Sequence, residues 1–242
     1  DFNNQLVYRM LRNQLQNILY CEKYSLTFIS NPKVACSTIK NSLLDGFEGN
    51  VHGEAAVRFS GNPNKNHDFF CITRNPYSRA LSCFKNKIGH GKELNPQNVW
   101  HPFCHRFNFD AQSRPTLKEY LQALEKDKNP ETFDMHYRCQ CINLHFKHIK
   151  PAYTGRIENF ENVKHYLSKY SINIILRNRH KTGSLSTYKN DIGPEEAALI
   201  REIYKQDFDI YGYSQELFSE FVPSPSYQNQ WISEEYILAF DS

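Results

Sequence analysis

The chain has 242 residues, of which 40% are hydrophobic and 23% charged, values typical of a globular protein rather than a disordered or fibrous one. Its formal net charge of +3 is too small to indicate a nucleic-acid-binding surface, so any anion site must be local. No apolar run approaches the roughly 20 residues of a membrane span, and we expect none in this chain.

The first part of the chain repeats one pattern of strand, polar turn and helix. Apolar residues at helical spacing over residues 6–19 predict a packing helix, and residues 25–30 form a short apolar strand pattern. A loop and a second helix with Ile39 and Leu43 inward follow. After a polar crossing, residues 69–73 predict another strand, and Asn75 and Pro76 are typical of the start of a helix.

The later elements continue the alternation. Residues 89–114 have no clear period and predict a long irregular excursion, after which Thr116 and Glu119 form a capping-box pattern. Strands are predicted over residues 152–157 and 172–176, and Pro194 opens a helix. We therefore expect an α/β fold, one domain over residues 1–222, and an extended C-terminal tail over residues 223–242.

The sequence "NPKVACSTIK" predicts a phosphate-binding loop that joins a strand to a helix. It offers backbone N–H groups, the hydroxyls of Ser37 and Thr38, and the ammonium of Lys33. A Walker loop carries glycines and places its lysine next to the helix, whereas here the lysine comes first. Lys33 would then reach past the phosphate toward the group attached to it. Alone, the loop is also compatible with a plain polar turn.

A second loop, "TRNPYSRALS", follows the strand over residues 69–73. Arg74 comes directly after that strand, and Ser82 lies about two helical turns later, so the pair could bracket a second phosphate. The alternatives are a salt bridge at the helix start and a serine on the helix surface.

Together, "PKVACSTIK" and "ITRNPYSRALSCF" closely resemble the two nucleotide-binding motifs of sulfotransferases that use 3′-phosphoadenosine 5′-phosphosulfate. The residues of these motifs are more similar to those of carbohydrate sulfotransferases than to those of the sulfotransferases that act on phenols and steroids. "DMHYRCQC", "YTGRIENFENV" and "DFDIYGY" extend the resemblance. It implies a P-loop-like three-layer sandwich with a central, mostly parallel sheet flanked by helices, and transfer of sulfonate to a carbohydrate or polysaccharide hydroxyl.

The resemblance also implies which residues hold the donor. Lys33 would contact the oxygen that bridges to sulfur, while Arg74 and Ser82 would hold the 3′-phosphate. The 5′-phosphate would lie against Val34, Ala35, Cys36, Ser37 and Thr38, and a late basic loop with Lys181, Thr182 and Gly183 would close over the nucleotide. The family usually has glycine where this chain has Ala35, so that position needs a compatible backbone angle.

The acceptor hydroxyl needs a proton acceptor, and the family usually uses His or Glu. We predict His52 as this general base, because it lies where similar enzymes carry theirs and because an unperturbed imidazole titrates at about pH 6.5. Lys33 is the other predicted catalytic residue. Glu54, His67 and His136 are the rival bases.

A set of polar residues outside the two motifs is predicted to bind the acceptor. His136, Arg138 and Gln140 alternate along the sequence, so an extended backbone would place all three on one side. A structural polar network is the alternative. The full predicted set is Glu54, His136, Arg138, Gln140, Arg156 and Glu158.

The cysteines indicate the redox state of the cellular compartment and whether the chain binds a metal. Their number is odd, seven, and Cys139 and Cys141 match no common zinc spacing, so we expect free thiols and no metal. A reducing compartment favours a bacterial cytoplasmic enzyme, and the alternative is a Golgi-lumen domain without its membrane anchor. The alternative functions are transfer to a non-carbohydrate hydroxyl, a P-loop kinase, and a non-catalytic nucleotide- or glycan-binding module.

Overall fold

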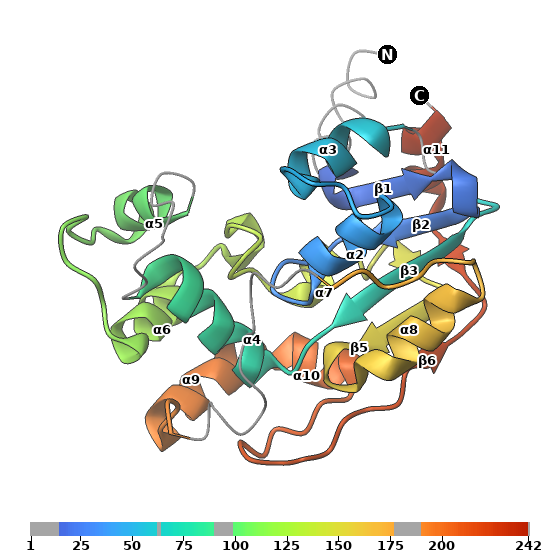
Figure 1. Ribbon diagram of the computed structural model, residues 1–242. Coiled ribbons are helices and arrows are strands. Elements are labelled where there is room, and N and C mark those ends of the chain that lie inside the picture. The colour runs from blue at the N-terminus through green and yellow to red at the C-terminus, as the bar shows by residue number, and fades with distance from the viewer. Residues whose placement is uncertain (1–14, 62–63, 90–98, 177–189, 242) are drawn as a thin grey trace. The chain divides into compact units, whose positions relative to one another are not determined.

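The computed structural model describes residues 15–61, 64–89, 99–176 and 190–241 (Figure 1). The chain forms two compact units. The first comprises Asp1–Thr73, Gln140–His180 and Ser224–Ser242, and the second comprises Arg74–Cys139 and Lys181–Pro223.

The first unit is built on a five-stranded sheet with the order β1-β2-β3-β5-β6. The three central strands, β2, β3 and β5, run parallel, and the edge strands β1 and β6 are antiparallel to their neighbours. The strands are β1 (Ile18–Cys21), β2 (Leu26–Ile29), β3 (Asp68–Thr73), β5 (Tyr153–Arg156) and β6 (Ser226–Tyr227). A separate two-stranded sheet pairs β4 (Ile149–Lys150) with β7 (Trp231–Ile232).

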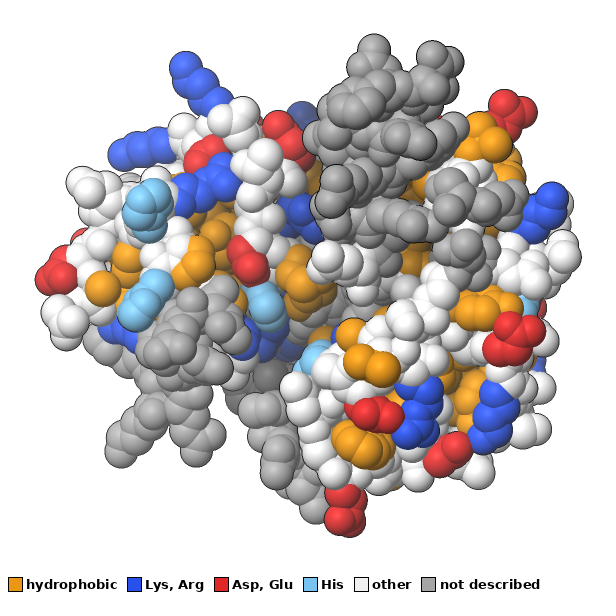
Figure 2. Space-filling model, turned by 90° about the horizontal axis from the view of Figure 1, so that it is seen from above, with side chains coloured by type: hydrophobic (Ala, Val, Ile, Leu, Met, Phe, Trp, Pro, Cys, Tyr) orange, Lys and Arg blue, Asp and Glu red, His pale blue; other side chains and the backbone are white. Residues whose placement is uncertain are grey.

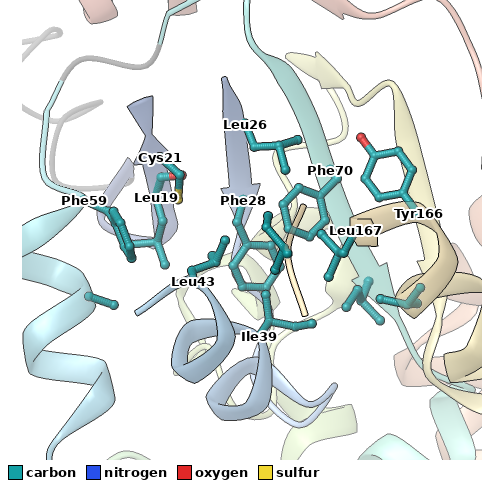
Figure 3. Close-up of a cluster of buried hydrophobic side chains, with 14 of the residues drawn as sticks. Leu19, Cys21, Leu26, Phe28, Ile39, Leu43, Phe59, Phe70, Tyr166 and Leu167 are labelled. Atoms are coloured by element: carbon teal, nitrogen blue, oxygen red, sulfur yellow. The ribbon is translucent and has the colours of Figure 1, made fainter. Parts of the chain in front are cut away.

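Helices cover both faces of the five-stranded sheet. Ile39 and Leu43 of α2 and Leu167 of α8 pack against Phe28 and Phe70 on one face (Figure 3). On the other face, Phe240 of α11 stacks on Phe69, whose side chain points opposite to that of Phe70. The remaining elements of this unit are η1 (Leu15–Asn17), η2 (Glu22–Tyr24), α2 (Cys36–Leu43), α3 (Val51–Arg58), α7 (Gln140–Asn143), η5 (Ile157–Asn159), α8 (Phe160–Ser168) and α11 (Glu234–Asp241).

The predicted three-layer α/β sandwich is therefore confirmed, and its mostly parallel character lies in the central strands. Leu26 and Phe28 reach the α2 face at the strand period of two. Parallel strands buried on both faces read as continuous apolar runs, which is why residues 25–30 and 69–73 were recognisable.

The second unit is helical, with an aromatic core in which the ring of Phe103 contacts those of Trp100, Tyr120 and Tyr137. Asn75 caps the first helix by accepting from the Tyr77 amide, as predicted. Its elements are α4 (Pro76–Cys83), the π-helical turn η3 (Phe84–Ile88), α5 (Trp100–Phe107), α6 (Leu117–Lys126), η4 (Pro130–Thr132), α9 (Pro194–Ile203) and α10 (Lys205–Tyr211).

Several sequence predictions of local structure are wrong. Residues 18–21 of the predicted opening helix form β1, because its backbone pairs with β2; residues 1–14 lie outside the described part. The predicted irregular excursion contains α5. Residues 172–176 form no strand: the Ile175 amide donates to Ser42 Oγ, and its carbonyl accepts from Asn41, so α2 side chains take the place of a strand ladder.

The predicted extended tail also differs from the structure. From Ser226 the chain adds β6, β7 and α11, and Tyr236 and Phe240 are buried. A short apolar helix that follows a Pro- and Ser-rich stretch was missed because its composition signal is diluted by its neighbours. The prediction of one domain over residues 1–222 stays a prediction.

Charged side chains of both signs are interspersed on the face drawn in Figure 2, as the net charge of +3 leads one to expect. No helix of the described residues is long and apolar enough to cross a membrane. All seven cysteines are free thiols.

Gly155 in β5 marks a close approach of α8 to the sheet. A Cβ atom there would lie 2.8 Å from Val163 Cγ2, so we expect Gly155→Ala to lower the free energy of unfolding by about 1–3 kcal/mol. Urea denaturation measures this. His165→Ala, on the exposed side of α8, is the control, and equal stability of the two variants would contradict the prediction.

Candidate functional site

The loop from Ser30 to Ala35 joins β2 to α2 and has an unusual backbone. Lys33 has a φ of 71° and Ala35 a φ of 61°, both left-handed, whereas Val34 between them is outside that region. Alternation of hand turns successive backbone N–H groups toward one concavity, a nest that binds anions. The loop thus has the backbone of a phosphate site without glycine.

The left-handed angle of Ala35 explains the departure from the usual glycine. Ala35 is the N-cap residue of α2 and offers no side-chain cap, so the first N–H groups of the helix remain available to a ligand. The Val34 side chain is fully buried in the core of the first unit. The buried Val34 therefore anchors the loop to the core between its two left-handed residues.

Buried amides fix the start of the loop. Asn31 donates from Nδ2 to Gln140 Oε1 at 3.0 Å and accepts at Oδ1 from Asn143 at 3.2 Å. All three side chains are fully buried. Gln140, predicted to bind the acceptor, thus lies in a polar network beneath the loop, the alternative that the sequence left open.

A cluster of Ser37, Lys40 and His52 lies where α3 packs beside α2. His52 Nε2 is 2.9 Å from Ser37 Oγ, and its Nδ1 is 3.2 Å from Lys40 Nζ. Asn50 caps α3 by accepting from the His52 and Gly53 amides. This cap fixes the position of His52 in the first turn of the helix. Burial lowers the pKa of Lys40. Neither α3 nor the contact of Lys40 with His52 is predicted from the sequence, although Lys40 is the last residue of "NPKVACSTIK".

The second predicted phosphate site lies in the second unit, along α4. Arg74 is buried and donates from Nε to Ser78 Oγ at 2.9 Å. Ser82 is one turn beyond Ser78, and its buried Oγ has no hydrogen-bond partner among the described residues. Since buried hydroxyls are nearly always paired, this orphan oxygen fits a ligand such as a phosphate. Ser78 was not predicted as part of this site, although it lies four residues after Arg74 and four residues before Ser82.

His136 has the arrangement of an oriented imidazole. Its Nδ1 lies 2.6 Å from Asp134 Oδ1. Burial alone would raise the pKa of Asp134, but the hydrogen bonds from the ring and the backbone of His136 outweigh it, so the pKa is lowered. An ionised carboxylate accepts, which keeps the Nδ1 proton in place and leaves Nε2 as the proton acceptor.

Buried donors hold the segment that carries His136. Arg79, only 2% exposed, donates to the carbonyl oxygens of Arg138 at 2.8 Å and Met135 at 3.1 Å. Tyr204 donates to the Tyr137 carbonyl. Residues 135–137 form a turn, so the predicted extended alternation of His136, Arg138 and Gln140 is wrong.

The remaining predicted residues lie apart from this arrangement. Glu54 pairs with Arg58 on α3, and His67 is buried and stacked on Tyr20. Arg156 is buried and donates to Thr73 Oγ1 at 2.7 Å, while Glu158 is half-buried in η5. Lys181, Thr182 and Gly183 lie outside the described residues.

A turn with this backbone between a strand and a helix of such a sheet is typical of proteins that hold phosphorylated ligands. Residues 16–214 match the sulfotransferase family, and the chain belongs to that family. The chain is similar to carbohydrate sulfotransferase 14 of Mus musculus, with 29% identity over 164 residues, which are 57% of this chain and 43% of the relative. The chain thus aligns with less than half of that relative. No solved structure matches the chain significantly.

Ala35 has a left-handed φ of 61°. A non-glycine residue at this angle costs about 1–2 kcal/mol, so Ala35→Gly should raise the free energy of unfolding by up to about 1 kcal/mol once the entropy of glycine is subtracted. Urea denaturation measures the change. Ala55→Gly in α3, where φ is helical and the side chain is buried, should instead lower stability by about 1 kcal/mol or more. A loss of stability in both variants would contradict the assigned loop geometry.

Proposed function

We propose that this sulfotransferase moves the sulfonate group of 3′-phosphoadenosine 5′-phosphosulfate to a hydroxyl of a carbohydrate or polysaccharide. The observation that carries the donor is the loop of alternating hand that leads from Lys33 into α2. Family membership supports sulfonate transfer, and the printed name of the mouse relative supports a carbohydrate acceptor.

The donor's two phosphates have separate candidate partners. In the first unit, the amides of residues 34–38 and the hydroxyls of Ser37 and Thr38 would hold the 5′-phosphate. In the second unit, Arg74 and Ser82 would hold the 3′-phosphate: the guanidinium offers forked donors, and the orphan Ser82 Oγ gains a partner. Lys181, Thr182 and Gly183 stay predictions for the closing loop.

The transfer needs positioning and charge more than covalent chemistry. The acceptor oxygen forms a bond to sulfur as the bond from sulfur to the bridging phosphate oxygen breaks, and the hydroxyl proton passes to a general base. Lys33 would neutralise the charge that develops on the departing oxygen. Adenosine 3′,5′-bisphosphate and the sulfated acceptor are the products, and no metal is required by this scheme.

We assign the general base to His136, with His52 as the alternative predicted from the sequence. The Asp134 carboxylate holds the Nδ1 proton of His136, and Arg79 and Tyr204 fix the backbone on either side of it. A base held in one tautomer with Nε2 as acceptor is the arrangement that proton abstraction needs.

Ligand binding tests the donor assignment. Adenosine 3′,5′-bisphosphate at a hundredfold excess over its Kd should raise the Tm by about 5–10 °C, because it binds only the folded chain. ATP with Mg²⁺ should not, and differential scanning fluorimetry measures both. A shift with ATP and none with the bisphosphate would favour a kinase and contradict the proposal.

Turnover with radiolabelled donor and a panel of glycans separates the remaining alternatives. Binding of the bisphosphate without transfer to any hydroxyl would indicate a non-catalytic module, and transfer only to non-carbohydrate hydroxyls would limit the proposal to sulfonate transfer. The bacterial cytoplasmic location, and its Golgi-lumen alternative, stay predictions.

Substitution of His136 tests the base. His136→Gln should lower kcat by about 10²–10⁴-fold and remove the acidic limb of the pH–kcat profile, with the Kd for the bisphosphate unchanged. Asp134→Asn should lower kcat as well, because the Nδ1 proton loses its acceptor. His105→Ala, on the exposed side of α5, is the control. Full activity of His136→Gln would return the role to His52.

A further inference from the structure

The cluster of Ser37, Lys40 and His52 makes a chain of hydrogen bonds that ends in the phosphate loop. Lys40 and Ser37 are three residues apart on α2 and lie on one face of that helix, and His52 of α3 touches both, with 2.9 Å from Nε2 to Ser37 Oγ and 3.2 Å from Nδ1 to Lys40 Nζ. All three belong to the first unit.

The donors and acceptors in this series of hydrogen bonds determine which nitrogen of the His52 ring carries the proton. A lysine ammonium has three donors and no acceptor, so His52 Nδ1 must accept from it. The ring is then neutral and carries its proton on Nε2. The only direction left for the second bond is donation from Nε2 to Ser37 Oγ.

Donation to Ser37 Oγ has a consequence for the loop. A hydroxyl that accepts a hydrogen bond at its oxygen is free to turn its own proton away from that donor. Ser37 is the second residue of α2, next to the N–H groups that the nest and the helix start offer to an anion. The Ser37 proton is therefore available for donation to an anion bound there.

We propose that Lys40 and His52 are positioning residues that orient the Ser37 hydroxyl as a donor to the 5′-phosphate, and that His52 is not the general base. This relay, the series of hydrogen bonds from Lys40 through His52 to Ser37, rests on the proposed function. In the relay the Nε2 proton is already in place, so the ring has no basic nitrogen to offer an acceptor hydroxyl. The relay also gives the half-buried Lys40 a partner inside the unit.

Substitutions of His52 separate positioning from base catalysis. His52→Ala should weaken binding of adenosine 3′,5′-bisphosphate about tenfold, because Ser37 loses the donor that orients it. His52→Gln keeps an N–H donor but has no basic nitrogen, so it should bind the bisphosphate within about threefold of wild type and retain most of kcat. Calorimetry and turnover with labelled donor measure these effects, with His165→Ala as control and thermal melts to verify folding.

Lys40 is tested in the same assays. Lys40→Met keeps the stem of the side chain and removes the donor, and should weaken bisphosphate binding to an extent similar to His52→Ala. The double variant should be no weaker than His52→Ala alone, because both substitutions break one chain of bonds. Additive losses would overturn the relay.

The tautomer of His52 gives a readout that needs no ligand. Long-range ¹H–¹⁵N correlation spectra of the whole chain, with the His52 signals assigned by their loss in His52→Gln, should show the proton on Nε2 in wild type and a changed tautomer ratio in Lys40→Met. A proton on Nδ1 in wild type would overturn the relay.

The failure of the relay and that of the proposed function can be told apart. Absence of bisphosphate binding by wild type contradicts the proposed function, while the tautomer still decides the orientation of the relay. Wild-type-like bisphosphate binding by both His52→Ala and Lys40→Met overturns the relay alone. Normal binding by His52→Gln with a kcat at least a hundredfold lower would identify His52 as the base.

Discussion

The left-handed backbone on either side of Val34 is the constraint on which the candidate site depends. Two non-glycine residues, Lys33 and Ala35, hold angles that cost free energy, and the side chain of Val34 between them is fully buried in the core. The strain is local and lies in a loop whose alternating hand gathers N–H groups.

Much of the fold was readable from the sequence, because its signals are local. The apolar runs of β2 and β3 identified buried parallel strands, and Thr116 with Glu119 forms the capping box that opens α6. The elements that were missed depend on distant partners. Residues 18–21 pair with β2, and residues 172–176 bond to side chains of α2, so neither outcome could be read from periodicity in the segment itself.

The candidate site divides in the same way. Lys33, Ala35 and Arg74 were identified by a motif, which records spacing along the chain. The partners of those residues lie on other elements: Gln140 holds Asn31, and Lys40 contacts His52 across two helices. Asp134 and His136 are two residues apart, but their significance comes from a ring orientation that no spacing specifies. Residue types were therefore easier to predict than the roles that their contacts give them.

The helix α4 joins two parts of the second unit that the chemistry would otherwise keep separate. Arg74, two residues before α4, donates to Ser78 on that helix, Ser82 lies one turn further, and the Arg79 side chain donates to the turn that carries His136. A phosphate bound at the proposed site on this helix would therefore also stabilise the backbone that carries His136. Under the proposed function, this shared support predicts an ordered kinetic mechanism in which the donor binds first, because the bound donor would already hold the turn that carries the proposed base when the acceptor arrives.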